Sequence, residues 1–339
     1  MRERLLRVAA SRPAAGVVRA LEHLPGPRRV TLTVLTYHRV VPPALATTVA
    51  PGLLSATTPS FEEQMRYVAR TRRLVSAADV VAAASGEAAL PVGATLVTFD
   101  DAYRDVADHA WPVLRRFDVP AVLFVPTGYP GRADRSFWWD RLYRALGRVA
   151  ADGGRIDTPV GTLAVTDDAD RAAAYRTLRT HLKSLPPREL ELAVEELDRD
   201  TGGPEPSSDV LDWDELVQLA AEGLELAPHS VDHPLLTGCD DERLRRELVA
   251  SADELEAATG VRIPMVAYPS GAHDDRVVTA TAAAGYLAAL TTDRGVNVVP
   301  APSHEGWLRL RRINVGSRTS LTVLRGQMLP VLAHSRRWR

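Results

Sequence analysis

The sequence of 339 residues is poor in cysteine and lysine. Cys239 is the only cysteine, which excludes a disulfide within the chain and any metal site built from several thiolates. Lys183 is the only lysine, so nearly all of the 41 basic residues are arginine. The formal net charge of -2 gives no overall basic field, and we attribute the arginine bias to a GC-rich genome, so we do not expect nucleic acid as a partner. A metal site in this chain must therefore use histidine and carboxylate ligands.

Long apolar runs are also missing. No segment is long and apolar enough to predict a transmembrane span, and residues 1–29 contain no apolar core typical of a signal peptide. These 29 residues mix arginine with leucine, valine and alanine, and we interpret them as a helical or frayed segment. The alternative is an Arg-rich amphipathic helix over 5–24 that contacts a membrane surface weakly. We expect a cytoplasmic protein.

From residue 30 onward, apolar β-branched runs alternate with helical patterns. The predicted strands are 30–37, 94–99, 121–125, 224–227, 265–268, 287–290 and 309–315, and the predicted helices are 60–72, 76–84, 102–117, 213–221, 240–259 and 275–284. This order predicts an α/β fold in which helices wrap a parallel sheet, and the strand count suits an incomplete TIM-like barrel. We expect this domain over 30–320 and a C-terminal tail over 321–339.

Residues 129–208 interrupt the alternation. They contain the aromatic run 137–140 and two helical patterns at 167–184 and 187–200, so we interpret them as a helical insertion. The insertion leaves from the carboxyl end of the third predicted strand. In parallel α/β folds the loops at that end converge on one face, where working residues lie.

Two groups of polar residues follow predicted strands directly. Asp100 and Asp101 close the strand at 94–99, and His229 and His233 follow the strand at 224–227. Two histidines four residues apart can bind one ion from a single turn, and Asp101 would complete a set that leaves room for water and substrate. The alternatives are that Asp101 only caps the next helix and that the histidine pair is structural.

Five segments, in the right order, resemble the polysaccharide deacetylases, the family with the NodB homology domain that is grouped as carbohydrate esterase family four. Residues 98–101 resemble its first motif, in which the first aspartate is the catalytic base and the second a metal ligand. Residues 223–237 are similar to its second motif, whose two histidines complete the metal site. The segments 35–40, 138–140 and 267–271 resemble a subgroup found with bacterial surface-polysaccharide synthesis. The resemblance covers 34–315 and implies a distorted, incomplete (β/α) barrel.

The resemblance implies a metal-dependent hydrolase that removes N-acetyl groups from an amino sugar in a polysaccharide, an oligosaccharide or a glycan precursor. Asp100 would be the base, and Asp101, His229 and His233 would bind a divalent transition metal, which we expect to be zinc. Two alternatives stay open. The same metal site could serve an O-acetyl esterase acting on a carbohydrate, or the chain could be a glycan-binding homologue without turnover.

Two family features are absent from the sequence. Ala267 stands where the third motif has an arginine that orients the base, so Arg311 or Arg312 would have to replace it. The late Leu-x-x-His motif, which supplies the general acid, is also missing. The acid is left open among three residues: His38, His273 and His304. Of these, we predict His273 as the catalytic residue, because it follows the third-motif loop.

Substrate contacts are predicted on three segments. Trp138 and Trp139 offer flat apolar faces for a sugar ring, and Asp140 offers a carboxylate for its hydroxyl groups. The alternative is that these tryptophans pack in the core and anchor the insertion. The remaining predicted substrate-binding residues are Tyr268, Ser270 and His38.

Overall fold

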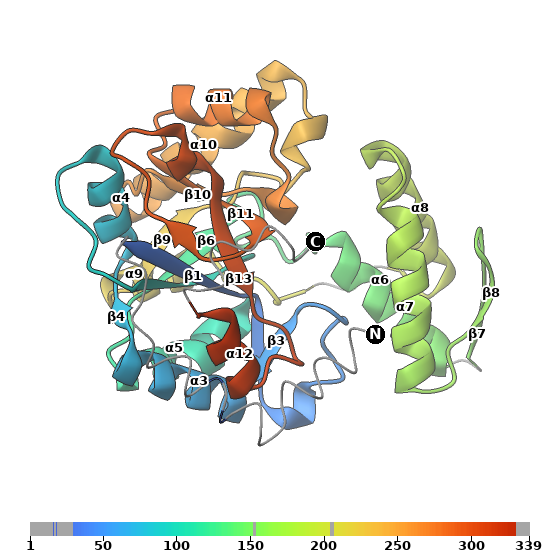
Figure 1. Cartoon of the computed structure of the whole chain (residues 1–339). Helices are drawn as coiled ribbons and strands as arrows, with labels where there is room; N and C mark the ends of the chain where they lie inside the picture. The colour runs from blue at the N-terminus through green and yellow to red at the C-terminus, as the bar shows by residue number, and fades with distance from the viewer. Residues whose placement is uncertain (1–15, 17, 19–29, 152–153, 204–206, 330–339) are drawn as a thin grey trace.

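The computed structural model describes residues 16, 18, 30–151, 154–203 and 207–329 (Figure 1). The segment 1–29, with the amphipathic helix expected over 5–24, lies outside the described residues except for Gly16 and Val18. Within the described part of the chain, no helix combines the length and the apolar character needed to cross a membrane. The membrane-surface contact of residues 5–24 stays a prediction.

Parallel strands form the centre of the protein (Figure 1). The main sheet follows the order β10-β11-β13-β1-β5-β6-β9, and each neighbouring pair on this path is parallel. The bounds are β1 (Thr31–Tyr37), β5 (Ala94–Phe99), β6 (Ala121–Val125), β9 (Glu225–Pro228), β10 (Met265–Ala267), β11 (Ala288–Arg294) and β13 (Leu310–Asn314), with β4 (Arg73–Leu74) beside β5 and β12 (Asn297–Val298) beside β1. Strands β9 and β10, at the two ends of the path, lie next to each other. The sheet is thus a nearly closed barrel, which confirms the predicted fold.

Successive residues of each strand face the barrel interior and the outer helices in turn. In β5, Leu96 belongs to the interior cluster, while Val97 and Phe99 pack beneath the helices. Asp100 comes two residues after Thr98 and four after Leu96, so it continues the inward-facing series at the carboxyl end of the strand. The period of two therefore directs a carboxylate into the mouth of the barrel.

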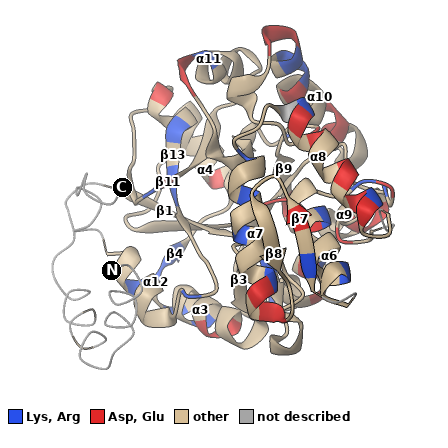
Figure 2. Cartoon of the chain, turned by 90° about the vertical axis from the view of Figure 1, so that its right-hand side faces the viewer, with Lys and Arg blue, Asp and Glu red and all other residues tan. Residues whose placement is uncertain are grey.

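Helices cover the outside of the barrel. Their bounds are α3 (Thr58–Thr71), α4 (Ala77–Ser85), α5 (Trp111–Arg116), α9 (Trp213–Ala221), α10 (Asp241–Thr259) and α11 (Asp275–Ala283). Apolar residues of α3, α5 and α9 share one cluster, those of α10 and α11 share another, and α4 packs against the interior cluster. Acidic and basic residues are mixed on the exposed face of α10 (Figure 2).

The helix predicted over 102–117 is not continuous. Asp101 and Ala102 adopt positive φ angles of 73° and 53°, so the chain turns before helical structure begins. A π-helical turn then covers Val106–Ala110, in which the Trp111 N–H donates to the Val106 carbonyl. Pro112 has no N–H for the ordinary helical hydrogen bond, and α5 begins only at this point.

The insertion contains more than the two predicted helices. It consists of α6 (Trp138–Ala151), a hairpin of β7 (Arg155–Thr158) and β8 (Gly161–Ala164), α7 (Asp168–Leu182) and α8 (Pro187–Asp200). Figure 1 shows α7, α8 and the hairpin at one side of the barrel, with α6 facing it. The hairpin was missed because its four-residue strands are largely exposed and lack a clear apolar alternation.

The segment expected as a C-terminal tail contains helix α12 (Leu321–Gln327). Leu324 and Met328 belong to the same apolar cluster as Phe61 and Met65 of α3. Residues 330–339 lie outside the described part of the chain. The domain therefore extends past residue 320, because α12 helps to bury α3.

We predict that Leu324→Ala lowers the free energy of unfolding by ~2–5 kcal/mol, since Leu324 is fully buried and truncation leaves a cavity. Leu192→Ala is the matched control, because Leu192 lies on helix α8 with 54% of its surface exposed. Thermal or urea denaturation measures both variants. Equal stability of the two would contradict the packing of α12 described above.

Candidate active site

The predicted metal ligands meet at the carboxyl end of the barrel. One ligand atom from each of Asp101, His229 and His233 lies within 4.8 Å of the others. Asp101 Oδ1 is 3.5 Å from His229 Nε2 and 3.4 Å from His233 Nε2. This oxygen is buried and has no hydrogen-bond partner. Since an unpartnered buried carboxylate oxygen is costly, its position opposite two imidazole nitrogens fits a bound cation.

His229 presents its Nε2 atom because its other nitrogen is occupied. Its Nδ1 lies 2.7 Å from the Ala267 carbonyl oxygen, which can only accept, so Nδ1 carries the proton and Nε2 keeps its lone pair. Burial lowers the pKa of His229 to about 4, which favours the neutral form that a metal requires. The same hydrogen bond joins the end of β9 to the end of β10.

The loop that carries His233 is shaped by left-handed backbone and by one buried glutamate. Ser230 and His233 have positive φ angles of 64° and 54°, a conformation that non-glycine residues adopt rarely. The N–H groups of Val231 and Asp232 both donate to Glu247 Oε2, at 2.9 and 2.8 Å, and Glu247 is fully buried on α10. Glu247 could not be predicted as a site residue from the sequence, because the pattern indicates its position on a helix but not the conformation of the loop that it binds.

Asp100 is paired with a buried arginine from β13. Arg312 Nη1 donates to Asp100 Oδ1 at 2.8 Å, and Arg312 Nε donates to the Thr291 carbonyl at 2.7 Å. Burial alone would raise the pKa of Asp100, but the charge of the adjacent Arg312 lowers it well below its usual range. Arg312 thus takes the role of the arginine that the family has at the position of Ala267. Arg311, the other candidate, is exposed.

The three candidate acids lie in different places. His38 follows β1, and its Nε2 is 3.9 Å from Asp100 Oδ2 with 27% of the side chain exposed. The His273 ring stacks on Tyr268 at 5.6 Å, and its Nδ1 lies 2.9 Å from the Gly271 carbonyl oxygen. His304 accepts a hydrogen bond from Gly306 and caps the short helical segment that leads into the start of β13, at the opposite end of the barrel. Of the three, His38 is the one whose ring lies beside Asp100, and burial lowers the pKa of this imidazole below its usual value.

Comparisons with known proteins were decisive for the family. The family model described as polysaccharide deacetylase matches residues 89–289, which is more than half of the chain. The chain belongs to the polysaccharide deacetylase family. No match is found among the curated proteins.

Solved structures of similar fold cover most of this deacetylase. The deacetylase PplD of Streptococcus pyogenes, in complex with acetate, has a TM-score of 0.58 and 20% identity, and the match covers 88% of this chain and 99% of that one. IcaB from Ammonifex degensii has a TM-score of 0.55 and 17% identity, covering 88% and 97%. The BpsB deacetylase domain from Bordetella bronchiseptica has a TM-score of 0.52 and 20% identity, covering 86% and 98%. At these identities the likeness shows the fold.

Tyr268 and Ser270 lie on the loop after β10 in different surroundings. Tyr268 is fully buried, its hydroxyl donates to the Leu308 carbonyl, and its N–H donates to the Leu290 carbonyl. Neither donor of Tyr268 is free for a substrate. Ser270 is exposed and has a left-handed backbone with φ 54°.

The aromatic run of the insertion lies mostly inside the deacetylase. Trp139 is buried, and its Nε1 donates to the Tyr103 hydroxyl at 2.8 Å, which in turn donates to Asp140 Oδ2 at 2.7 Å. Asp140 is therefore directed to the interior, away from the surface where sugar hydroxyls were expected. Trp138 is half-buried. The sequence analysis missed Tyr103, although it lies only two residues after Asp101.

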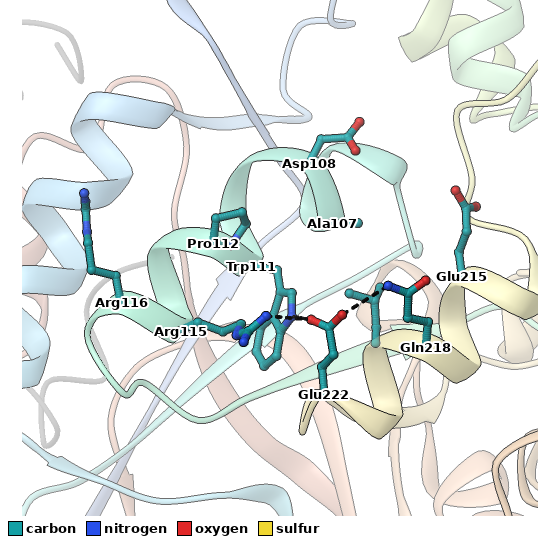
Figure 3. A pocket seen from close by; sticks show the side chains of 10 residues that line it. Ala107, Asp108, Trp111, Pro112, Arg115, Arg116, Glu215, Gln218 and Glu222 are labelled. Carbon is teal, nitrogen blue, oxygen red and sulfur yellow. Dashed lines mark hydrogen bonds and ion pairs between the residues drawn. The ribbon is translucent and has the colours of Figure 1, made fainter.

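A separate hollow of about 650 Å³ lies outside the barrel, between the π-helical turn with α5 and helix α9 (Figure 3). Glu222 accepts hydrogen bonds from Trp111 Nε1 and Arg115 at its edge, and Gln218 also donates to Glu222. Arg104 pairs with Glu215 there. These groups bind each other, and the hollow is lined by outer helices rather than by the strand ends that carry Asp100.

Asp140 makes the stability of the deacetylase depend on pH. Burial raises the pKa of Asp140 to about 6, despite the opposing charge of Arg39. The folded state therefore binds a proton more tightly than the unfolded chain does, and this group's contribution to stability falls as the pH rises from about 4 to above 6.

We predict that Asp140→Asn removes this fall, because the amide still accepts from Tyr103 but carries no charge. The stability of the variant relative to wild type should be higher at pH 7.5 than at pH 4.5, by up to ~3 kcal/mol. Denaturation at both pH values measures it, with Asp214→Asn on the exposed side of α9 as control. A difference that does not change with pH would refute the prediction.

Proposed function

We propose that this deacetylase removes N-acetyl groups from an amino sugar of a polysaccharide, an oligosaccharide or a glycan precursor, with the help of a bound metal ion. One observation carries the proposal: an ion-paired, buried Asp100 lies beside the Asp101, His229 and His233 cluster at one end of the barrel. Metal-assisted hydrolysis of an amide uses this combination of a base and a cation site.

Asp101, His229 and His233 would hold the metal. Two imidazoles and one carboxylate suit a divalent transition metal, and zinc is the ion we expect. When bound, such an ion polarises a carbonyl oxygen and lowers the pKa of a bound water. The buried, unpartnered Asp101 Oδ1 and the free Nε2 of His229 support this assignment.

Asp100 accepts the proton of the attacking water. Arg312 occupies Oδ1, so Oδ2 is the oxygen left for the proton, and the charge of Arg312 keeps the carboxylate ionised beforehand. Arg312 is itself fixed by the Thr291 carbonyl. Because Arg312 is held in place, it also fixes the orientation of the Asp100 carboxylate.

His38 gives a proton to the leaving nitrogen. It lies on the side of Asp100 Oδ2 and is partly open to solvent, so we propose it as the acid in place of His273, whose ring stacks on Tyr268. The water oxygen bonds to the acetyl carbon, the carbon–nitrogen bond breaks, and the amine takes the proton from His38. Acetate and a free amino sugar are the products. The backbone N–H of Tyr268 is already bound to the Leu290 carbonyl. We therefore propose that the backbone N–H of Ser270 donates to the carbonyl oxygen of the acetyl group.

The metal site and the base are tested together. We predict one zinc ion per chain in the purified protein, lost in His229→Ala and in His233→Ala.

Asp100→Asn should keep the metal but lose ~10²–10⁴-fold in turnover, because the amide cannot accept a proton. Elemental analysis and acetate release from chitooligosaccharides, compared with acetylated xylan, are the measurements. Faster release from xylan would favour the O-acetyl esterase, and zinc retained in both histidine variants would exclude the site.

The acid is tested by changing the leaving group. His38→Ala should lower acetate release from an N-acetylated oligosaccharide by ~10²–10⁴-fold, yet affect 4-nitrophenyl acetate much less, because that leaving group departs without a proton. His304→Ala is the control, since His304 caps a segment at the other end of the barrel. If His273→Ala shows the selective loss and His38→Ala does not, the roles must be exchanged.

A further inference from the structure

The two histidines of the metal cluster are held by different means. His229 has its Nδ1 fixed by a carbonyl of another strand. Within the described residues, no other element hydrogen-bonds to Nδ1 of His233. Its ring instead lies at steep angles to three neighbouring rings, those of Trp139 at 5.1 Å and 70°, Phe137 at 5.7 Å and 74°, and His229 at 4.8 Å and 74°. Apart from a hydrogen bond to its own backbone, the orientation of this imidazole therefore depends on packing against these rings.

Trp139 is held by both ring stacking and a hydrogen bond. Its indole lies parallel to Phe137 at 4.6 Å, and its Nε1 donates to the Tyr103 hydroxyl. Tyr103 is covered by the Arg39 guanidinium at 4.5 Å, and Arg39 is paired with buried Asp105. The indole is thus connected to the chain segment that carries Asp101, two residues before Tyr103.

A second set of contacts ties the start of the insertion to the His233 loop. Arg135 lies between Gly128 and Asp232, donating to the carbonyl of the first at 3.0 Å and to Oδ1 of the second at 2.9 Å. The N–H groups of Thr127 and Gly128 donate to the carbonyls of Ser230 and Val231. A Cβ atom at Gly128 would lie 2.9 Å from the backbone carbonyl oxygen of Val231, so a side chain there has no room. The start of the insertion and the His233 loop are consequently packed against each other.

We propose that Trp139 is a positioning residue for the metal site: the indole, fixed by Tyr103, holds the His233 imidazole in the orientation that binds the ion. Helix α6 of the insertion then belongs to the metal centre. This role differs from the sugar contact predicted for Trp139 from the sequence. It rests on the proposed metal site at Asp101, His229 and His233.

The experiment compares zinc affinity in full-length variants by competition with a chromophoric chelator. Trp139→Leu should weaken zinc binding by ~10–100-fold, the range found when a residue that orients a metal ligand is lost. Trp139→Phe keeps an aromatic face against His233 and should recover part of the affinity. Trp138→Leu is the matched control, because Trp138 is adjacent on α6 and contacts Trp139 rather than His233. It should bind zinc as wild type does.

The visible spectrum of the cobalt-substituted proteins gives a second measurement, because it reports the geometry around the ion. It should change in Trp139→Leu and stay the same in Trp138→Leu. A purely structural tryptophan would lower the melting temperature of the metal-free protein but leave affinity and spectrum of the folded protein unchanged, which would overturn the proposal.

If Trp139→Leu does not fold, Trp139→Phe decides alone. A zinc affinity below that of wild type supports the positioning role, and an affinity equal to wild type refutes it. Wild-type protein that binds no zinc would refute the metal site itself, whereas normal wild-type binding together with unchanged Trp139 variants would refute only the positioning role.

Discussion

The buried ion pair between Arg312 and Asp100 is the interaction on which the site depends. Both side chains have left water, so each needs the other: removing one partner of such a pair costs ~3–5 kcal/mol, because the remaining charge is buried alone. The pair joins β13 to the end of β5 over β1, which lies between these two strands in the sheet. The proposed base and the stability of the fold therefore depend on the same contact. A neutral Asp100 would leave the buried charge of Arg312 without its counter-ion.

The pair also follows from the geometry of the strands. Leu310 and Leu96 both face the barrel interior, and Arg312 and Asp100 continue the inward-facing rows of their strands by an even number of residues. A residue at an odd step would point to the outer helices, as Arg311 does at the surface. The family's usual arginine position is Ala267, yet a guanidinium still reaches the base because the mouth of a narrow barrel is accessible from several strands.

The sequence was sufficient to predict the barrel and the proximity of Asp101, His229 and His233, because apolar periodicity marks buried strands and parallel strands bring their carboxyl ends together. The inward row of β13 could also have separated Arg312 from Arg311. Other features could not be predicted from the sequence. The hairpin β7–β8 is short and exposed, and α12 is stabilised by packing on α3 rather than by its own seven residues. The burial of Trp139 and Asp140 depends on how α6 faces the His233 loop, which is a tertiary relation.

The hydrogen bond from His229 to the Ala267 carbonyl lies where the barrel has its seam, since β9 and β10 are the strands that end the paired path. Local opening of the barrel costs less free energy between β9 and β10, which end the hydrogen-bonded path, than between strands that are paired along it. The imidazole that would face the proposed ion on one side thus joins two strand edges on the other. If an ion binds at the proposed site, its binding and the closure of the seam are linked equilibria, and removing the ion would weaken the contact between β9 and β10.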